Sequence, residues 1–142
     1  MSDETATAVR PHHVGLTVED LDRARDWYVT AFGFELAMAF ELPGGARGAM
    51  LRTPGGAGVE LFEVAGSAEG LAWADPSAAL RRRGFGHVAL EVDDLDGAFR
   101  DAVGAGGGAV WDPRPSPEPG RRMAFVHDPE GNLVELIGPP VG

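Results

Sequence analysis

The chain contains two copies of one sequence pattern, and this duplication limits its fold more than any other feature. The segment HHVGLTVEDLDRA begins at His12, and GHVALEVDDLDGA begins 74 positions later at Gly86. A second pair of segments, RTPGGAGVELFE from Arg52 and HDPEGNLVELIG from His127, matches at an offset of 75. Two repeats are too few for a solenoid, so we expect two modules of about 60 residues that pair and close on each other, either within one chain or across a dimer.

Each copy predicts the element order βαβββ. The segment HHVGLTV alternates as a half-buried strand does, and Asp20 can cap a helix that ends at Gly33. Three short strands should follow, at about 34–42, 47–53 and 58–64. The second copy predicts a helix from Asp94 and strands at 85–92, 108–112, 121–127 and 132–137. The proline-rich segment 113–119 predicts a surface loop or lid, because proline has no N–H to donate to a sheet.

These patterns divide the chain into two modules. We expect a flexible tail at 1–11, a first module at 12–64, a linker at 65–84, a second module at 85–138 and a tail at 139–142. The first residues, MSDETATAVR, carry acids and threonines in place of the positive and apolar regions of a secretory signal.

Composition excludes several classes of function. The chain has 12 Lys and Arg against 22 Asp and Glu, a net charge of −10, which is the opposite of what nucleic-acid backbones require. No apolar run approaches the roughly 20 residues that span a bilayer. The absence of cysteine excludes disulfides, thiolate nucleophiles and cysteine-based metal sites. We therefore expect an acidic cytoplasmic protein in which only His, Asp or Glu could hold a metal.

The duplication also repeats a pair of chemically useful residues. Each copy carries a His on its first predicted strand and a Glu on its last, namely His13 and Glu60, then His87 and Glu135. If the modules fold alike, two imidazoles and two carboxylates can converge on one axis. Such a donor set suits a divalent Zn, Ni, Co, Mn or Fe ion better than Ca or Mg. Two coordination positions would remain open for substrate oxygens, and the metal could stabilise an enolate or enediolate.

Other residues give weaker signals. Trp27 and Tyr28 are expected in the core, and His12 is expected outside the site, because neighbours on a strand point to opposite faces. The basic run 81–83 is expected to be a solvated patch, or one that attracts an anionic substrate. The residues that could line a substrate pocket are Phe125, Met123, Trp111, His127 and Glu41, and Trp73 is a further aromatic candidate.

Three segments resemble the vicinal oxygen chelate superfamily, which includes the glyoxalase, bleomycin resistance and dioxygenase proteins. They are HHVGLTVEDLDRARDWYVTAFGFEL, GFGHVALEVDDLDGAF and DPEGNLVELIGP. The resemblance implies an α+β fold in which two tandem βαβββ modules pair into a U-shaped, partly open mixed sheet around a central metal site. It assigns the metal-ligand roles to His13, Glu60, His87 and Glu135.

The four-ligand pattern resembles glyoxalase I-like and methylmalonyl-CoA epimerase-like members. It implies a metal-dependent lyase, isomerase or epimerase acting on a small molecule, with Glu60 or Glu135 as the base and a homodimeric assembly. One alternative is an Fe(II) extradiol-type dioxygenase in which Glu60 is not a ligand. The other is a non-catalytic protein that confers resistance by binding a small molecule such as an antibiotic.

Overall fold

The computed structural model describes residues 7–141, and in it each half of the chain has the order βαβββ. The first half contains β1 (Val14–Thr17), α1 (Leu21–Phe32), β2 (Glu35–Glu41), β3 (Arg47–Arg52) and β4 (Gly58–Glu63). The second half contains β5 (Val88–Glu91), α3 (Leu95–Gly104), β6 (Gly108–Pro115), β7 (Arg122–His127) and β8 (Leu133–Ile137). Residues 1–6 of the expected N-terminal tail, and residue 142, lie outside the described residues.

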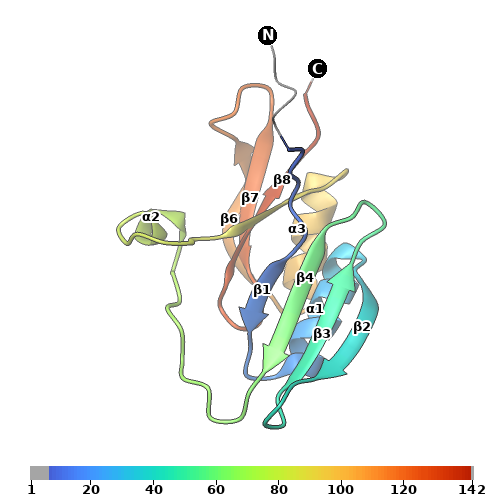
Figure 1. Ribbon diagram of the computed structural model, residues 1–142. Helices are drawn as coiled ribbons and strands as arrows, with labels where there is room; N and C mark the ends of the chain where they lie inside the picture. Colours follow the sequence, from blue (N-terminus) through green and yellow to red (C-terminus); the bar gives the residue numbers. More distant parts are fainter. Residues whose placement is uncertain (1–6, 142) are drawn as a thin grey trace.

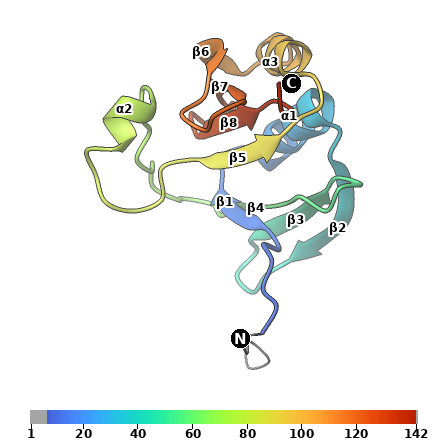
Figure 2. The same cartoon turned by 90° about the horizontal axis from the view of Figure 1, so that it is seen from above.

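The strands form two separate four-stranded mixed sheets, where the sequence resemblance implied one U-shaped sheet (Figures 1 and 2). Their orders are equivalent, β1-β4-β3-β2 and β5-β8-β7-β6, with the first pair parallel and the others antiparallel. Even the register repeats, since Val14 lies beside Val59 and Val88 beside Val134. The duplication therefore extends from sequence to backbone.

Both long helices begin at the predicted residues. The Asp20 side chain accepts a hydrogen bond from the Arg23 N–H, and the Asp94 side chain accepts one from the Gly97 N–H. These bonds satisfy N–H groups that the first helical turn leaves without a partner. At the end of α1, Gly33 takes the left-handed conformation (φ 74°) that a residue without Cβ adopts readily.

The helices pack side by side and join the two modules (Figure 2). Trp27 and Tyr28 are buried, as expected of core residues. The Trp27 Nε1–H donates to the Ala102 carbonyl of α3 at 2.8 Å, and the Tyr28 hydroxyl donates to Asp128 at 2.8 Å. Burial, with the nearby Asp128 carboxyl as a second cause, raises the pKa of Tyr28 well above its usual value. One core thus spans both halves of the chain.

Two segments differ from the sequence prediction. Strand β6 continues to Pro115, so residues 113–115 are strand, and residues 116–121 close a hairpin into β7. Proline is tolerated there because β6 lies at the edge of its sheet. One side of the strand has no neighbouring strand, so a backbone N–H on that side is not required for pairing. The linker contains a short helix, α2 (Pro76–Ala79). Among residues 7–141 no helix is both long and apolar enough to cross a bilayer.

Candidate active site

Each module brings its predicted His and Glu together. His13 Nε2 lies 3.1 Å from Glu60 Oε1, and His87 Nε2 lies 3.0 Å from Glu135 Oε1. Both histidines stand immediately before the first strand of their module, and both glutamates lie on the parallel neighbouring strand. The two pairs are therefore equivalent in position and in geometry.

Strand alternation places both glutamates on the sheet face away from the helices. Glu60 lies between Val59 and Leu61, which are buried against the helices, so its side chain points to the opposite face. The same holds for Glu135, between Val134 and Leu136. The carboxylates keep 20% and 16% of their side-chain surface exposed, which leaves them accessible to a small molecule.

The donor types and spacing of each pair fit half of a divalent metal site. Imidazole and carboxylate together suit Zn, Ni, Co, Mn or Fe(II). Two neighbouring ligands that each lie about 2.1 Å from one ion at a right angle stand about 3 Å apart. This is the separation found in both pairs. Within the described chain, however, no group of three or more His, Asp or Glu side chains is close enough to hold an ion.

The His12 ring contacts the candidate ligand His13, whereas strand alternation predicts that the two rings point to opposite faces. The two Nδ1 atoms lie 2.8 Å apart, at hydrogen-bonding distance. The pair precedes β1, so the alternation of a regular strand does not separate the two rings. Arg52 donates to the His12 carbonyl at 2.7 Å, and its Nη2 lies 2.8 Å from His12 Nε2. His12 and Arg52 thus fix the ring of His13 from the side away from Glu60.

A glycine makes this arrangement possible. Gly58 faces Arg52 in the β3–β4 register, and a Cβ at Gly58 would lie 2.6 Å from both Arg52 Nη1 and the His12 carbonyl oxygen. The arginine side chain therefore crosses β4 where there is no side chain. The repeat-equivalent position in the second module is Leu133, which is buried, so this path exists in the first module alone.

Aromatic and apolar side chains surround the second pair instead. The Phe125 ring packs edge-on against His87 at a centroid distance of 5.2 Å, and Trp111 packs against Phe125 at 5.5 Å. Met123 and Leu133 belong to the same cluster, which Trp73 and Ala79 from the linker cover. Three of the predicted pocket residues, Trp111, Met123 and Phe125, are thus gathered beside His87 and Glu135.

The remaining two predicted pocket residues lie in different places. His127 ends β7, and its Nε2 lies 2.7 Å from the Trp73 carbonyl, so it contacts the linker that covers this cluster. Glu41, at the end of β2, lies opposite Arg47 in the β2–β3 register. Arg47 points to the helix face together with Ala49 and Leu51 of the core, so Glu41 lies on that face as well. Glu41 is therefore on the opposite face of its sheet from Glu60.

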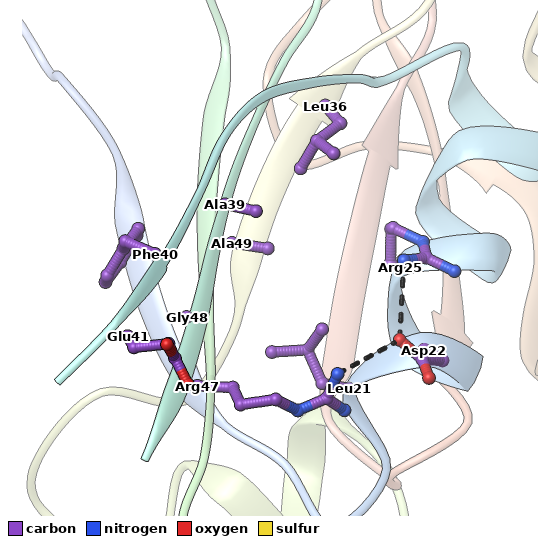
Figure 3. A pocket seen from close by; sticks show the side chains of 10 residues that line it. All are labelled: Leu21, Asp22, Arg25, Leu36, Ala39, Phe40, Glu41, Arg47, Gly48 and Ala49. Atoms are coloured by element: carbon purple, nitrogen blue, oxygen red, sulfur yellow. Dashed lines mark ion pairs between the residues drawn. The ribbon is translucent and has the colours of Figure 1, made fainter. Parts of the chain in front are cut away.

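Glu41 lines a separate pocket between α1 and β2 (Figure 3). There Arg25 and Arg47 both approach Asp22, at 3.4 Å and 3.7 Å, and Arg47 also pairs with Glu63 at 3.1 Å. The Leu21 N–H and then Arg47 donate hydrogen bonds to Glu63 and hold its pKa below the usual value. The charges of Asp22, Arg25, Arg47 and Glu63 therefore balance one another, and this pocket is separate from the His–Glu pairs.

Two contributors to the aromatic side lie outside the predicted strands. Trp73, a further pocket candidate in the sequence, reaches the cluster from the linker, whereas sequence reasoning missed Arg114. Arg114 lies 5.0 Å above the Trp111 ring, in the segment that the prolines had marked as a loop. Arg114 could have been found only by predicting that β6 continues past Pro113. That prediction requires β6 to be an edge strand, which the sequence does not show.

Known proteins are similar to this chain in sequence and in architecture. The family model for the Glyoxalase/Bleomycin resistance protein/Dioxygenase superfamily matches residues 10–136. A 2-epi-5-epi-valiolone epimerase from an Actinomyces species is 32% identical, and the match covers 95% of this chain and 82% of that protein. A probable lactoylglutathione lyase from a Synechocystis species is 25% identical, with 88% and 92% covered.

A solved structure shows the same architecture. The crystal structure of glyoxalase I from Zea mays superposes with a TM-score of 0.72 at 28% identity. The match covers 90% of this chain but 44% of the maize chain, so this chain spans less than half of that enzyme's length. The family match extends over both His–Glu pairs and nearly all of both modules. The chain belongs to the Glyoxalase/Bleomycin resistance protein/Dioxygenase superfamily.

Proposed function

We propose that the chain is a metal-dependent lyase, isomerase or epimerase that acts on a small molecule carrying two neighbouring oxygens. The observation that carries this proposal is the repeated His–Glu pair, with N···O separations of 3.1 Å and 3.0 Å at equivalent positions. Relatives named as lactoylglutathione lyase and as an epimerase support this class of reaction. Both names are consistent with proton movement beside an oxygen-bearing carbon.

His13, Glu60, His87 and Glu135 would hold the metal. When bound, a divalent ion of the Zn, Ni, Co, Mn or Fe type supplies a Lewis acid that favours loss of a proton beside a carbonyl. The histidines serve as ligands and orient the site. One of the carboxylates, Glu60 or Glu135, takes the proton from carbon and returns it to the neighbouring position. The apolar cluster around Phe125 excludes water from one side of the substrate.

We propose further that two chains assemble each site. No group of three ligands forms among residues 7–141 of one chain, whereas a symmetric dimer could join the first pair of one chain to the second pair of the other. A mixture of Glu60→Ala and Glu135→Ala chains tests this. A shared site predicts that subunit exchange restores about a quarter of wild-type activity, in the heterodimers that contain one intact site. No recovery after verified exchange would place both pairs of a site in one chain.

Deuterium exchange tests the reaction class directly. Metal-loaded protein is incubated in D2O with S-lactoylglutathione and with 2-epi-5-epi-valiolone, and NMR follows deuterium uptake beside the oxygen-bearing carbons. The proposal predicts uptake or conversion that His13→Ala abolishes. Oxygen consumption with an iron-loaded protein and a catechol would support the dioxygenase alternative. Binding without exchange or turnover would support a resistance protein that sequesters its ligand.

A further inference from the structure

Arg114 is aimed at the aromatic cluster by an irregularity in β6. In the β6–β7 register, Trp111 lies opposite Phe125 and Arg114 lies opposite Met123. An advance of three residues along β6 therefore matches an advance of two residues along β7. A β-bulge of this kind adds one residue and redirects the side chains beyond it. In a regular strand, residues three apart point to opposite faces. Here Trp111 and Arg114 share one face, the face that carries Phe125 and Glu135.

The result is a continuous row of side chains from the reactive pair to a positive charge. Glu135 contacts His87, the His87 ring packs on Phe125, Phe125 packs on Trp111, and the Arg114 guanidinium lies 5.0 Å over the Trp111 ring. A guanidinium in this position is oriented by the ring face, while its outer N–H groups remain free to donate.

Arg114 also differs from the other arginines with described contacts. Carboxylates pair with Arg23, Arg25, Arg47, Arg121 and Arg122, and Arg52 bonds to His12. Among residues 7–141 no carboxylate lies within ion-pair distance of Arg114, whose one side-chain hydrogen bond goes to the Asp112 carbonyl at 3.0 Å. In a chain with a net charge of −10, an uncompensated guanidinium at the end of an aromatic row favours an anionic ligand.

We infer that the substrate is an organic anion whose apolar body lies along Trp111 and Phe125 and whose carboxylate or phosphate is bound by Arg114. This inference deepens the proposed function and rests on it for the placement of the reacting oxygens near Glu135. The anionic group would be bound away from those oxygens. Arg114 is then a determinant of substrate specificity.

The test compares matched small molecules by NMR titration in EDTA, so that no metal contributes. The probes are phenylacetate, phenyl phosphate and the neutral phenylacetamide, followed at the Arg114 Nε–H and the Trp111 Nε1–H. We expect at least one anion to bind about tenfold or more tightly than the amide, as a charge-assisted hydrogen bond provides. Whichever anion is preferred identifies the carboxylate or the phosphate as the recognised group.

Two variants complete the test. Arg114→Met should reduce the preference for the anion to about onefold, whereas Arg100→Met, which removes the same charge from an exposed position on α3, should leave the preference unchanged. An equal preference in wild type and Arg114→Met, or no anion binding at all, would overturn the inference. Because these titrations need no metal, their outcome is independent of whether the protein binds a metal and turns over substrate.

Discussion

The two modules hold the same His–Glu pair in different surroundings. In the first module, the ring of His13 is contacted by His12, which Arg52 fixes through backbone and ring. In the second, the ring of His87 packs against Phe125 within an apolar cluster that the linker covers. Duplication preserved the candidate ligands, while the residues around them diverged. We therefore propose that the first module gives polar support to a metal ligand and that the second contacts the substrate.

The largest expected effect distinguishes the two carboxylates. Glu60→Gln and Glu135→Gln keep side-chain size, so circular dichroism should show an unchanged fold. Loss of the general base should lower kcat by about 10²–10⁴-fold. The variant with the lower kcat at full metal occupancy identifies the base. Wild-type kcat in both variants would remove these carboxylates from the proton transfer.

A second contrast concerns the β-turns at residues 53–57 and 128–132, which are equivalent in the repeat. Asp128 is 2% exposed and accepts hydrogen bonds from the Tyr28 hydroxyl and from the Asn132 and Glu130 N–H groups. Thr53, its counterpart, accepts one bond from the Ala57 N–H. Asp128→Ala should lower the free energy of unfolding by about 3 kcal/mol, because it leaves several donors without a partner. Thr53→Ala should cost about 1 kcal/mol or less.

Urea denaturation measures both variants. The Asp128 bond to Tyr28 joins the second module to the first, so its loss should also reduce the cooperativity of unfolding. Equal losses for Asp128→Ala and Thr53→Ala would show that the bond between the modules contributes nothing beyond the local turn.

The polar support of His13 predicts a difference in metal affinity. His12→Ala removes the hydrogen-bond partner of His13 Nδ1 and should weaken metal binding about tenfold, as loss of such outer partners typically does. Trp111→Leu, in the aromatic row of the second module, should change KM and leave metal affinity within about twofold. Competition against a chelator measures both affinities. Reversed effects would contradict the division of roles between the modules.

The smallest expected effects should be equal. Asp20 and Asp94 cap α1 and α3 through equivalent hydrogen bonds. Replacement of either by Ala should lower stability by about 1 kcal/mol in thermal or urea unfolding. A difference much above about 0.5 kcal/mol would mean that one cap has a role beyond its helix, and Asp20 would then be tested together with Glu130, which accepts from its N–H.

The sequence predicts what depends on local chemistry and on the repeat. The caps at Asp20 and Asp94, and the joining of His13 to Glu60 and of His87 to Glu135, follow from patterns within each module. Features that depend on contacts between distant segments were missed. Arg114 reaches the aromatic cluster through a bulge on an edge strand.

Two further features of the structure depend on where a strand begins or on contacts between distant segments. Strand alternation does not apply to His12, because β1 begins two residues later, and the contact with Arg52 depends on space left by Gly58 on another strand. The linker carries no hydrophobic period, yet Trp73 and Ala79 cover the second sheet. Neither arrangement can be read from spacing along the chain.

The central claim is that the two His–Glu pairs together hold one metal ion. Elemental analysis of purified protein, repleted with each candidate ion and compared with His13→Ala and Glu135→Ala, tests this claim most directly. If the two kinds of pair share one ion, the wild type should contain about one Zn, Ni, Co, Mn or Fe ion for each chain, and both variants should lose it. A wild type without metal after repletion, or a variant that retains full occupancy, would contradict it.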